Sequence, residues 1–343
     1  MEFHVKWLQW ATIDLVNGVG GVENHARCMA RELTKLGVQT FFSKDPKDFY
    51  REKWDVIHSH GSSISALEWV KLRRHRDKSQ TMVFTNHGLT PTRMIACGEL
   101  LWPGGYVATG RELVGTLFSD VVLSVNPSIQ EFAKHFPAVT KMCPNAGDTG
   151  DAPGPKKLSF ELEAKLKSMR PFWTVVGRYG DAMKGPERIP PILRALPALT
   201  LVACPGAGFE NLTKVFQTGR QETSAQVLEI MKLSKGLLLT STWETGPIVV
   251  LEALAHGVPV ACTNVGYIPS LSSKIKGLEV LKVPTTAAFV EAIKRIPVEN
   301  ATEGERFERA QWNKNYLPTW QQSAKIAFEA VLDSRQKRTV RSP

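Results

Sequence analysis

Two glutamates on either side of a predicted helix start have the spacing of a ligand site. Residues 237–260 read as a strand, a loop, a helix and a second strand, with Pro247 opening the helix and Gly257 ending it. Glu244 lies in the loop and Glu252 lies on the helix. Since a helix N-terminus offers N–H groups and partial positive charge, it suits an anion. The pattern favours a phosphorylated ligand rich in hydroxyl groups, and the alternative is a pair of solvated acids.

A glycine-rich turn lies near the start of the chain. Residues 16–23, Val-Asn-Gly-Val-Gly-Gly-Val-Glu, precede a helix predicted over residues 23–36. A glycine loop that enters a helix can hold a phosphate. Residues 18–21 do not complete a G-x-G-x-x-G motif, so the dinucleotide-binding signal is weak.

Histidines stand at the ends of two predicted strands. His58 and His60 fall on the same face of the strand within residues 54–61, which allows a metal pair, although no third ligand is apparent. His87 ends the strand within residues 82–88, at the edge where ligands of open α/β sheets gather. The alternative for His87 is a structural role at the strand end.

Strands and helices alternate twice along the chain. One series ends near residue 148, residues 147–157 read as a linker, and a second series begins with the strand predicted at 172–176. This alternation predicts an α/β chain of two doubly wound, Rossmann-like domains, residues 1–150 and 151–317, facing a cleft. A last helix is predicted over 320–333, with a frayed basic end at 335–341.

Composition limits the classes of protein. The chain has 343 residues, 43% of them hydrophobic, which favours a globular protein of two domains. No apolar run reaches the ~18 residues of a membrane span. The N-terminal residues lack a signal-peptide layout, so cytoplasmic residence is expected. The five cysteines are widely spaced without a C-x-x-C pair, which argues against disulfides and cysteine zinc sites.

The chain is strongly basic. Its net charge of +10 suits a phosphorylated substrate, an anionic membrane surface or nucleic acid. Residues 71–76, Lys-Leu-Arg-Arg-His-Arg, are either a solvated helix face or a docking surface for an acidic partner. No nucleic-acid reading motif is present, so no nucleic acid is expected as a partner.

Taken in order, these motifs resemble the retaining GT-B glycosyltransferases of family GT4, the glycosyl transferases group 1. They are G-G-V-E at 20–23, D-V-I-H-S-H at 55–60, T-N-H-G at 85–88, G-R and K-G at 177–178 and 184–185, the E-x₇-E pair Glu244 and Glu252, and G-V-P-V at 257–260. Together they extend over nearly the whole chain. The resemblance implies an N-terminal acceptor-side domain, a C-terminal donor domain, and a final helix, 318–343, that packs back on the first domain.

The resemblance also implies roles in the second half of the chain. Arg178 and Lys184 would hold the nucleotide diphosphate and stabilise its charge as it leaves, which agrees with the value of preorganised cations at a departing phosphate. Glu252 would bind ribose hydroxyls. Glu244 would bind the donor sugar together with backbone groups of Thr245, Gly246 and Ile248. For Arg178 and Lys184, the alternative is ordinary surface charge.

In the first half, the resemblance implies that Gly20 and Gly21 let the backbone approach the diphosphate and that His87 lies near the reacting sugar. The chain also departs from the family pattern. The usual E-G-[FL]-P appears as Glu244-Thr245-Gly246-Pro247, so the loop around the donor sugar differs. The stretch 144–148, Pro-Asn-Ala-Gly-Asp, replaces the usual P-N-G-[VI]-D.

The expected function is therefore that of a retaining, hexosyltransferase-type enzyme with a UDP- or GDP-sugar as donor. It needs no metal, and its acceptor is a glycan, a lipid or a small molecule. Peripheral contact with an anionic inner membrane face is a further expectation. The alternative is a catalytically silent GT-B-like protein that binds a nucleotide or glycan. A nucleic-acid-binding role rests on the charge alone.

Overall fold

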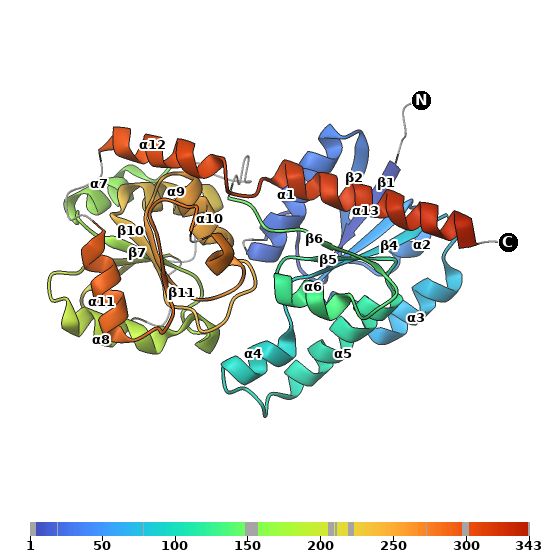
Figure 1. The fold of residues 1–343 in the computed structure, drawn as a ribbon, viewed down its shortest axis with the longest axis horizontal. Helices are drawn as coiled ribbons and strands as arrows, with labels where there is room; N and C mark the ends of the chain where they lie inside the picture. The colour runs from blue at the N-terminus through green and yellow to red at the C-terminus, as the bar shows by residue number, and fades with distance from the viewer. Residues whose placement is uncertain are drawn as a thin grey trace. The chain divides into compact units, whose positions relative to one another are not determined.

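The computed structural model describes residues 5–18, 20–77, 79–147, 157–204, 209, 211–218, 223–271, 273–296 and 302–341 (Figure 1). The chain forms two compact units, the first made of Met1–Asn145 with Thr319–Pro343 and the second of Ala146–Pro318. Most of the expected linker, residues 148–156, lies outside the described part of the chain.

The first unit is built on a six-stranded parallel sheet of order β2-β1-β3-β4-β5-β6. Its strands are β1 Val5–Trp10, β2 Val38–Ser43, β3 Val56–His60, β4 Thr81–Asn86, β5 Val121–Ser124 and β6 Val139–Met142. Its helices are α1 Gly21–Lys35, α2 Asp48–Arg51, α3 Ala66–His75, α4 Thr90–Ala96, α5 Pro103–Phe118, α6 Pro127–Ala133 and α13 Trp320–Arg341, with a 3₁₀ turn at Gly61–Ser63.

The second unit repeats the plan with a six-stranded parallel sheet of order β12-β11-β10-β7-β8-β9. Its strands are β7 Trp173–Val176, β8 Leu201–Cys204, β9 Val215–Gln217, β10 Gly236–Leu239, β11 Val260–Thr263 and β12 Leu278–Leu281. Its helices are α7 Phe160–Ser168, α8 Ile189–Ala195, α9 Ser224–Leu233, α10 Ile248–Ala255, α11 Thr286–Arg295 and α12 Glu303–Lys314. 3₁₀ turns lie at Ala182–Lys184, Pro186–Arg188 and Ile268–Leu271.

The central strands are apolar runs because helices cover both faces of each sheet. All residues of β3, β4, β5, β10 and β11 are buried. Parallel pairing brings the carboxyl ends of neighbouring strands to one edge. In each sheet the strand order reverses next to the first strand, between β1 and β3 and between β7 and β10. Such reversal points are where doubly wound sheets bind ligands.

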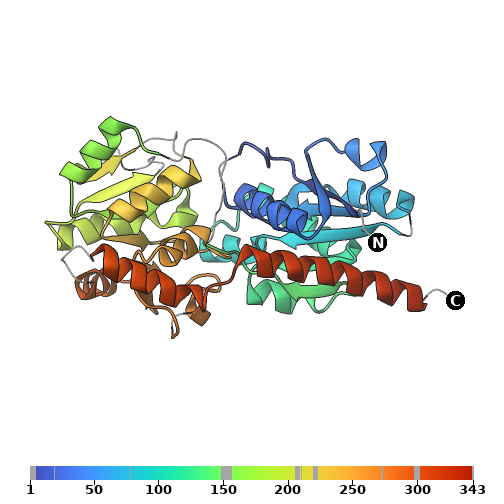
Figure 2. The same cartoon turned by 90° about the horizontal axis from the view of Figure 1, so that it is seen from above.

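The last helix is longer than predicted, because its basic end is not frayed. Helix α13 continues to Arg341 and lies beside α1 in the first unit (Figures 1 and 2). Arg335 donates to the carbonyl oxygen of Asp55 at 2.8 Å, and Arg338 donates to that of Gln80 at 2.9 Å. These bonds hold the end of the helix on the sheet.

Two arginines of the basic stretch 71–76 form ion pairs within the first unit. Arg76, whose side chain is 12% exposed, pairs with the buried carboxylate of Asp120. Arg73 pairs with the other oxygen of Asp120 at 3.2 Å, and Arg338 approaches the same carboxylate at 3.5 Å. The stretch is therefore neither wholly a solvated face nor wholly available to an acidic partner.

Candidate functional site

Two loops of the second unit are joined at the point where its strand order reverses. Thr240 donates its hydroxyl to the carbonyl oxygen of Lys184 at 2.9 Å. Arg188 donates to the carbonyl oxygen of Thr240 at 2.8 Å and to the Thr242 hydroxyl at 2.7 Å. The Thr242 N–H donates to the carbonyl oxygen of Met183 at 2.8 Å. These bonds fix the loop after β7 against the loop after β10.

Gly185 is required by this junction. Its φ of 63° lies in the left-handed region, and a Cβ there would stand 2.2 Å from the carbonyl oxygen of Thr240. The sequence pattern included Gly185 in the motif but did not single out Arg188, whose side chain fills the same junction. The sequence signal that could have identified Arg188 is a second basic residue three positions after the K-G pair.

Lys184 and Glu244, both predicted from the sequence, are in direct contact. The Lys184 ammonium lies 2.5 Å from Glu244 Oε1, and the two side chains are 17% and 12% exposed. The Ser241 hydroxyl donates to the same oxygen at 2.9 Å. The structure thus joins the predicted phosphate-binding cation to the predicted sugar-binding acid.

Arg178 lies in the same loop as Lys184, directly after the end of β7. Its side chain is exposed, and within the described ranges its guanidinium has no hydrogen-bond or ion-pair partner. It therefore supplies positive charge that nothing in the described chain neutralises.

Glu252 is a buried acid on α10. It is 5% exposed, and its Oε1 atom has no hydrogen-bond partner among the described residues. Burial raises the pKa of its carboxyl to about 8. An unpartnered buried carboxyl oxygen costs free energy, which is recovered when a hydroxyl donor binds to it.

The start of α10 differs slightly from the prediction. Pro247 is the residue that caps the helix, with extended φ and ψ of −66° and 98°, and Ile248 is the first helical residue. The carbonyl of Pro247 can then accept from the Val250 N–H at 3.1 Å. Thr245 and Gly246 lie just before this cap, and Gly266 in the loop after β11 packs against Thr245, as a Cβ there would lie 2.6 Å from its carbonyl oxygen.

The predicted glycines of the first unit lie at the start of α1. Gly20 is the extended N-cap and Gly21 is the first helical residue. A Cβ on Gly20 would stand 2.5 Å from the Glu23 carboxylate. The close approach of Glu23 is therefore sufficient reason for a glycine at position 20.

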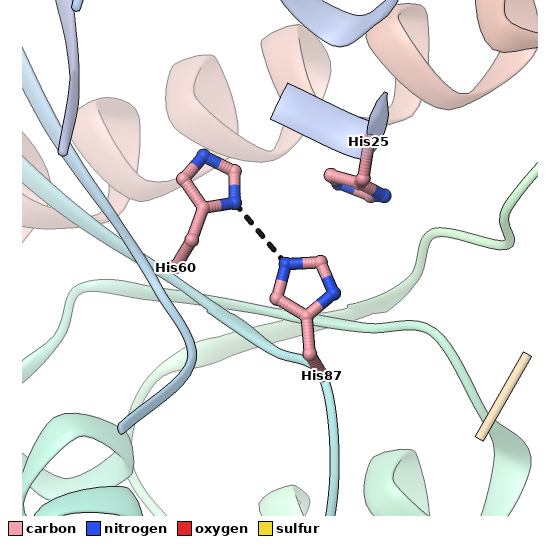
Figure 3. A group of neighbouring side chains, drawn as sticks. All are labelled: His25, His60 and His87. Atoms are coloured by element: carbon pink, nitrogen blue, oxygen red, sulfur yellow. Dashed lines mark hydrogen bonds between the residues drawn. The ribbon is translucent and has the colours of Figure 1, made fainter. Parts of the chain in front are cut away.

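His87 belongs to a group of three histidines that the sequence did not reveal. Its imidazole lies with those of His60 and His25, and one nitrogen from each falls within 4.8 Å of the others (Figure 3). The sequence allowed His58 and His60 as a metal pair without an apparent third ligand, and the structure groups His60 with different histidines. His58 is engaged elsewhere, by Trp7 at 3.2 Å and Thr85 at 2.6 Å, and His25 on α1 joins His60 instead.

Comparison with known proteins identifies the second unit. Residues 207–314 match the family model Glycosyl transferases group 1. The match extends from before β9 to the end of α12 and includes both Glu244 and Glu252. The chain is a glycosyltransferase. No curated protein sequence matched it.

Solved structures show the fold of this glycosyltransferase. The sucrose-phosphate synthase of Thermosynechococcus elongatus is 15% identical with a TM-score of 0.66, over 97% of this chain and 98% of that one. The catalytic domain of starch synthase IV from Arabidopsis thaliana, bound to ADP and acarbose, is 14% identical with a TM-score of 0.68, over 97% and 99%. The α,α-trehalose 6-phosphate synthase of Burkholderia multivorans is 10% identical with a TM-score of 0.62, over 97% and 99%. The predicted fold class, a GT-B chain of two Rossmann-like domains, is confirmed.

Among the helices in the described part of the glycosyltransferase, none combines the length and the apolar character needed to cross a bilayer.

Proposed function

We propose that this glycosyltransferase moves a sugar from a nucleoside-diphosphate sugar to an acceptor with retention of anomeric configuration, as in family GT4. The second unit binds the donor, for which a UDP- or GDP-sugar is the expected form. The observation that carries this proposal is the junction of the two loops at the reversal point of the sheet, where Lys184 pairs with Glu244 and Arg178 lies in the same loop as Lys184.

Lys184 is available to a diphosphate by exchange of partners. In the free protein its ammonium is paired with Glu244 at 2.5 Å. A donor that places a phosphate beside Lys184 and a sugar hydroxyl beside Glu244 replaces one pair by two charge-assisted hydrogen bonds. Arg178 adds a second positive charge. Both features suit a ligand in which an anionic group and hydroxyl groups are close neighbours.

The same cations lower the barrier of the transfer. The bond between the anomeric carbon and the phosphate oxygen breaks as the acceptor oxygen bonds to that carbon from the same face. The acceptor proton passes to the departing phosphate oxygen. Negative charge grows on the diphosphate as the bond breaks, and preorganised cations stabilise it. This step uses no protein nucleophile and no metal.

Glu252 is the proposed partner of the ribose. Its buried Oε1 atom has an unused acceptor site, and α10 fixes the position of the carboxyl. A ribose hydroxyl group that donates a hydrogen bond to Glu252 Oε1 gives this buried oxygen the partner it lacks. The roles that the resemblance gives to Gly20, Gly21 and His87, and the identity of the acceptor, remain predictions.

A panel of UDP-, GDP- and ADP-sugars tests the proposal, with binding measured by calorimetry and donor cleavage by product analysis. One donor should bind and be turned over. Lys184→Gln should lower its use about 10- to 150-fold, the value of a charged hydrogen bond. Lys232→Gln is the matched control, because Lys232 also forms a lysine–glutamate pair, at 2.7 Å, but on the exposed face of α9.

Two outcomes would separate the alternatives. Tight nucleotide binding without cleavage of any donor would favour the catalytically silent binding protein suggested by the altered Glu244–Pro247 loop. Turnover with inversion at the anomeric carbon, read by NMR of the first product, would contradict the retaining mechanism while leaving glycosyl transfer intact.

A further inference from the structure

The first unit contains a cluster of three histidines, His25, His60 and His87, of which only His87 has a role implied by the resemblance, near the reacting sugar. The three residues come from three different elements, namely α1, the end of β3 and the segment just after β4. His25 and His60 are buried and His87 is half-buried. The cluster lies at the carboxyl edge of the sheet, where Figure 3 shows the three rings gathered around a common centre.

Hydrogen bonds on the outer side of two rings fix which nitrogen faces this centre. His60 Nε2 lies 2.6 Å from the side-chain oxygen of Gln9, so it carries the proton and donates. His25 Nδ1 lies 2.8 Å from the side-chain oxygen of Asn145 and donates in the same way. Since a neutral imidazole carries one N–H, His60 Nδ1 and His25 Nε2 each direct a lone pair inward.

The centre of the cluster has more lone pairs than protons. His87 Nε2 lies 3.2 Å from His60 Nδ1 and donates to it in one tautomer, whereas the tautomer with the proton on His87 Nδ1 directs a third lone pair inward. His25 Nε2 is buried and has no hydrogen-bond partner among the described residues. A fully buried acceptor without a donor is rare, and a bound cation is one explanation for it.

We infer that His25 Nε2, His60 Nδ1 and His87 Nε2 form a three-histidine site for a divalent transition metal of the zinc type. Zinc–nitrogen bonds of about 2.0–2.1 Å in tetrahedral geometry place ligand nitrogens roughly 3.3 Å apart. The 3.2 Å between His60 and His87 already matches. The third nitrogen, within 4.8 Å, needs a movement of at most about 1.5 Å.

The chemistry of the ligands selects the metal. Three neutral imidazoles without a carboxylate suit zinc, cobalt, nickel or copper, whereas magnesium and calcium prefer oxygen ligands. Gln9 and Asn145 provide the outer hydrogen bonds that usually orient histidine ligands. Among the described residues no fourth ligand joins the three, which leaves one tetrahedral position for water or a hydroxyl-bearing ligand.

Cobalt titration of the chelator-treated, full-length protein tests the site. We expect one equivalent of Co²⁺ to give visible absorption bands typical of low coordination number, and Zn²⁺ to abolish them by displacement. X-ray absorption at the zinc edge should show three imidazole ligands in the wild-type protein. Absence of stoichiometric binding, or a first shell without imidazole, would overturn the proposal.

Variants locate the site in the fold. His87→Gln, at the half-buried position, and His25→Gln should each lose the cobalt bands, and Gln9→Ala should weaken binding about 10- to 100-fold through loss of the outer hydrogen bond. The exposed His135→Gln is the control and should bind like the wild type. Near-ultraviolet circular dichroism of each metal-free variant shows whether the fold is kept. Unchanged cobalt bands in a folded His87→Gln variant would place the metal elsewhere and contradict the assignment.

Discussion

Glu252 differs from Glu244 in the state of its carboxyl group. Glu244 has a cation and a hydroxyl as partners, whereas Glu252 is buried on α10 with an unpartnered oxygen. Two acids on neighbouring segments therefore have different uses. Under the proposed function, Glu244 exchanges partners when the diphosphate binds, and Glu252 offers a fixed hydrogen-bond acceptor whose ionisation is disfavoured by burial.

The raised pKa of Glu252 predicts a loss of stability as pH rises. The unfolded chain releases this proton above the usual value of 4.5, while the folded chain holds it to about 8. The folded state therefore binds more protons between these values, and this contribution, complete below 4.5, declines by up to ~1.4 kcal/mol per pH unit as pH rises toward 8. Urea unfolding of the second unit at several pH values in this window should show the slope. Glu252→Gln should flatten it, and an equal slope in both proteins would contradict the argument.

The Lys184–Glu244 pair predicts opposite effects on binding and turnover. Glu244→Gln removes the internal competitor for the Lys184 ammonium, so a nucleoside diphosphate should bind about 2- to 5-fold more tightly, the range of a partly exposed ion pair. Donor turnover should fall, because the donor sugar loses the carboxylate that accepts a hydrogen bond from its hydroxyl group. Calorimetry with the nucleotide and turnover with its sugar measure the two effects. Glu229→Gln on α9 is the control, because it breaks another lysine–glutamate pair, Lys232–Glu229, that is exposed to solvent. It should change neither nucleotide affinity nor donor turnover.

At the scale of elements, the two loops of the proposed donor site act as one structure. The loop after β7 and the loop after β10 are far apart in sequence, yet several hydrogen bonds join them at neighbouring strand ends. The position of Lys184 thus depends on the backbone at Thr240 and not only on its own loop.

Gly185→Ala should disrupt this junction. The residue needs a left-handed φ of 63°, and its new methyl group would meet the Thr240 carbonyl oxygen at 2.2 Å. The left-handed conformation alone costs roughly 1–2 kcal/mol for a residue with a Cβ, so thermal unfolding should shift downward and nucleotide affinity should fall. Gly180→Ala, in the same loop with open space around its Cα, is the control. Equal affinities in the two variants would show that the junction does not position the site.

At the scale of the whole molecule, each unit carries its own group of functional candidates at its own reversal point. The second unit holds the cation–acid junction and the first holds the histidines. The chain as a whole carries a net charge of +10. Such a charge raises the local concentration of anionic ligands without selecting among them.

The whole-molecule charge predicts that binding of a nucleoside diphosphate weakens several-fold between about 50 and 500 mM NaCl, because salt screens the attraction between exposed charges. The matching uncharged nucleoside should show little change over the same range. Calorimetry with both ligands separates the electrostatic part from the rest. A diphosphate affinity independent of salt would contradict a role for the exposed Arg178 and the surrounding charge.

The sequence by itself determined the fold class and predicted most residues of the proposed donor site. Apolar runs of strand length alternating with helical periodicity leave few arrangements other than doubly wound sheets. The pair Glu244 and Glu252 lies within one strand–loop–helix segment, where local geometry fixes the spacing. Lys184 was found because its G-R…K-G motif is also local.

Only the tertiary structure decided which distant residues meet. His25 joins His60 and His87 because the strand order places α1 beside the ends of β3 and β4, and its outer partner Asn145 is 120 residues away. Arg76 and Arg338 converge on Asp120 for the same reason. Sequence periodicity records which face of an element is buried, but not which neighbour covers it. The order of strands in the sheet supplies that information, and with it the cluster that the sequence left as an incomplete pair.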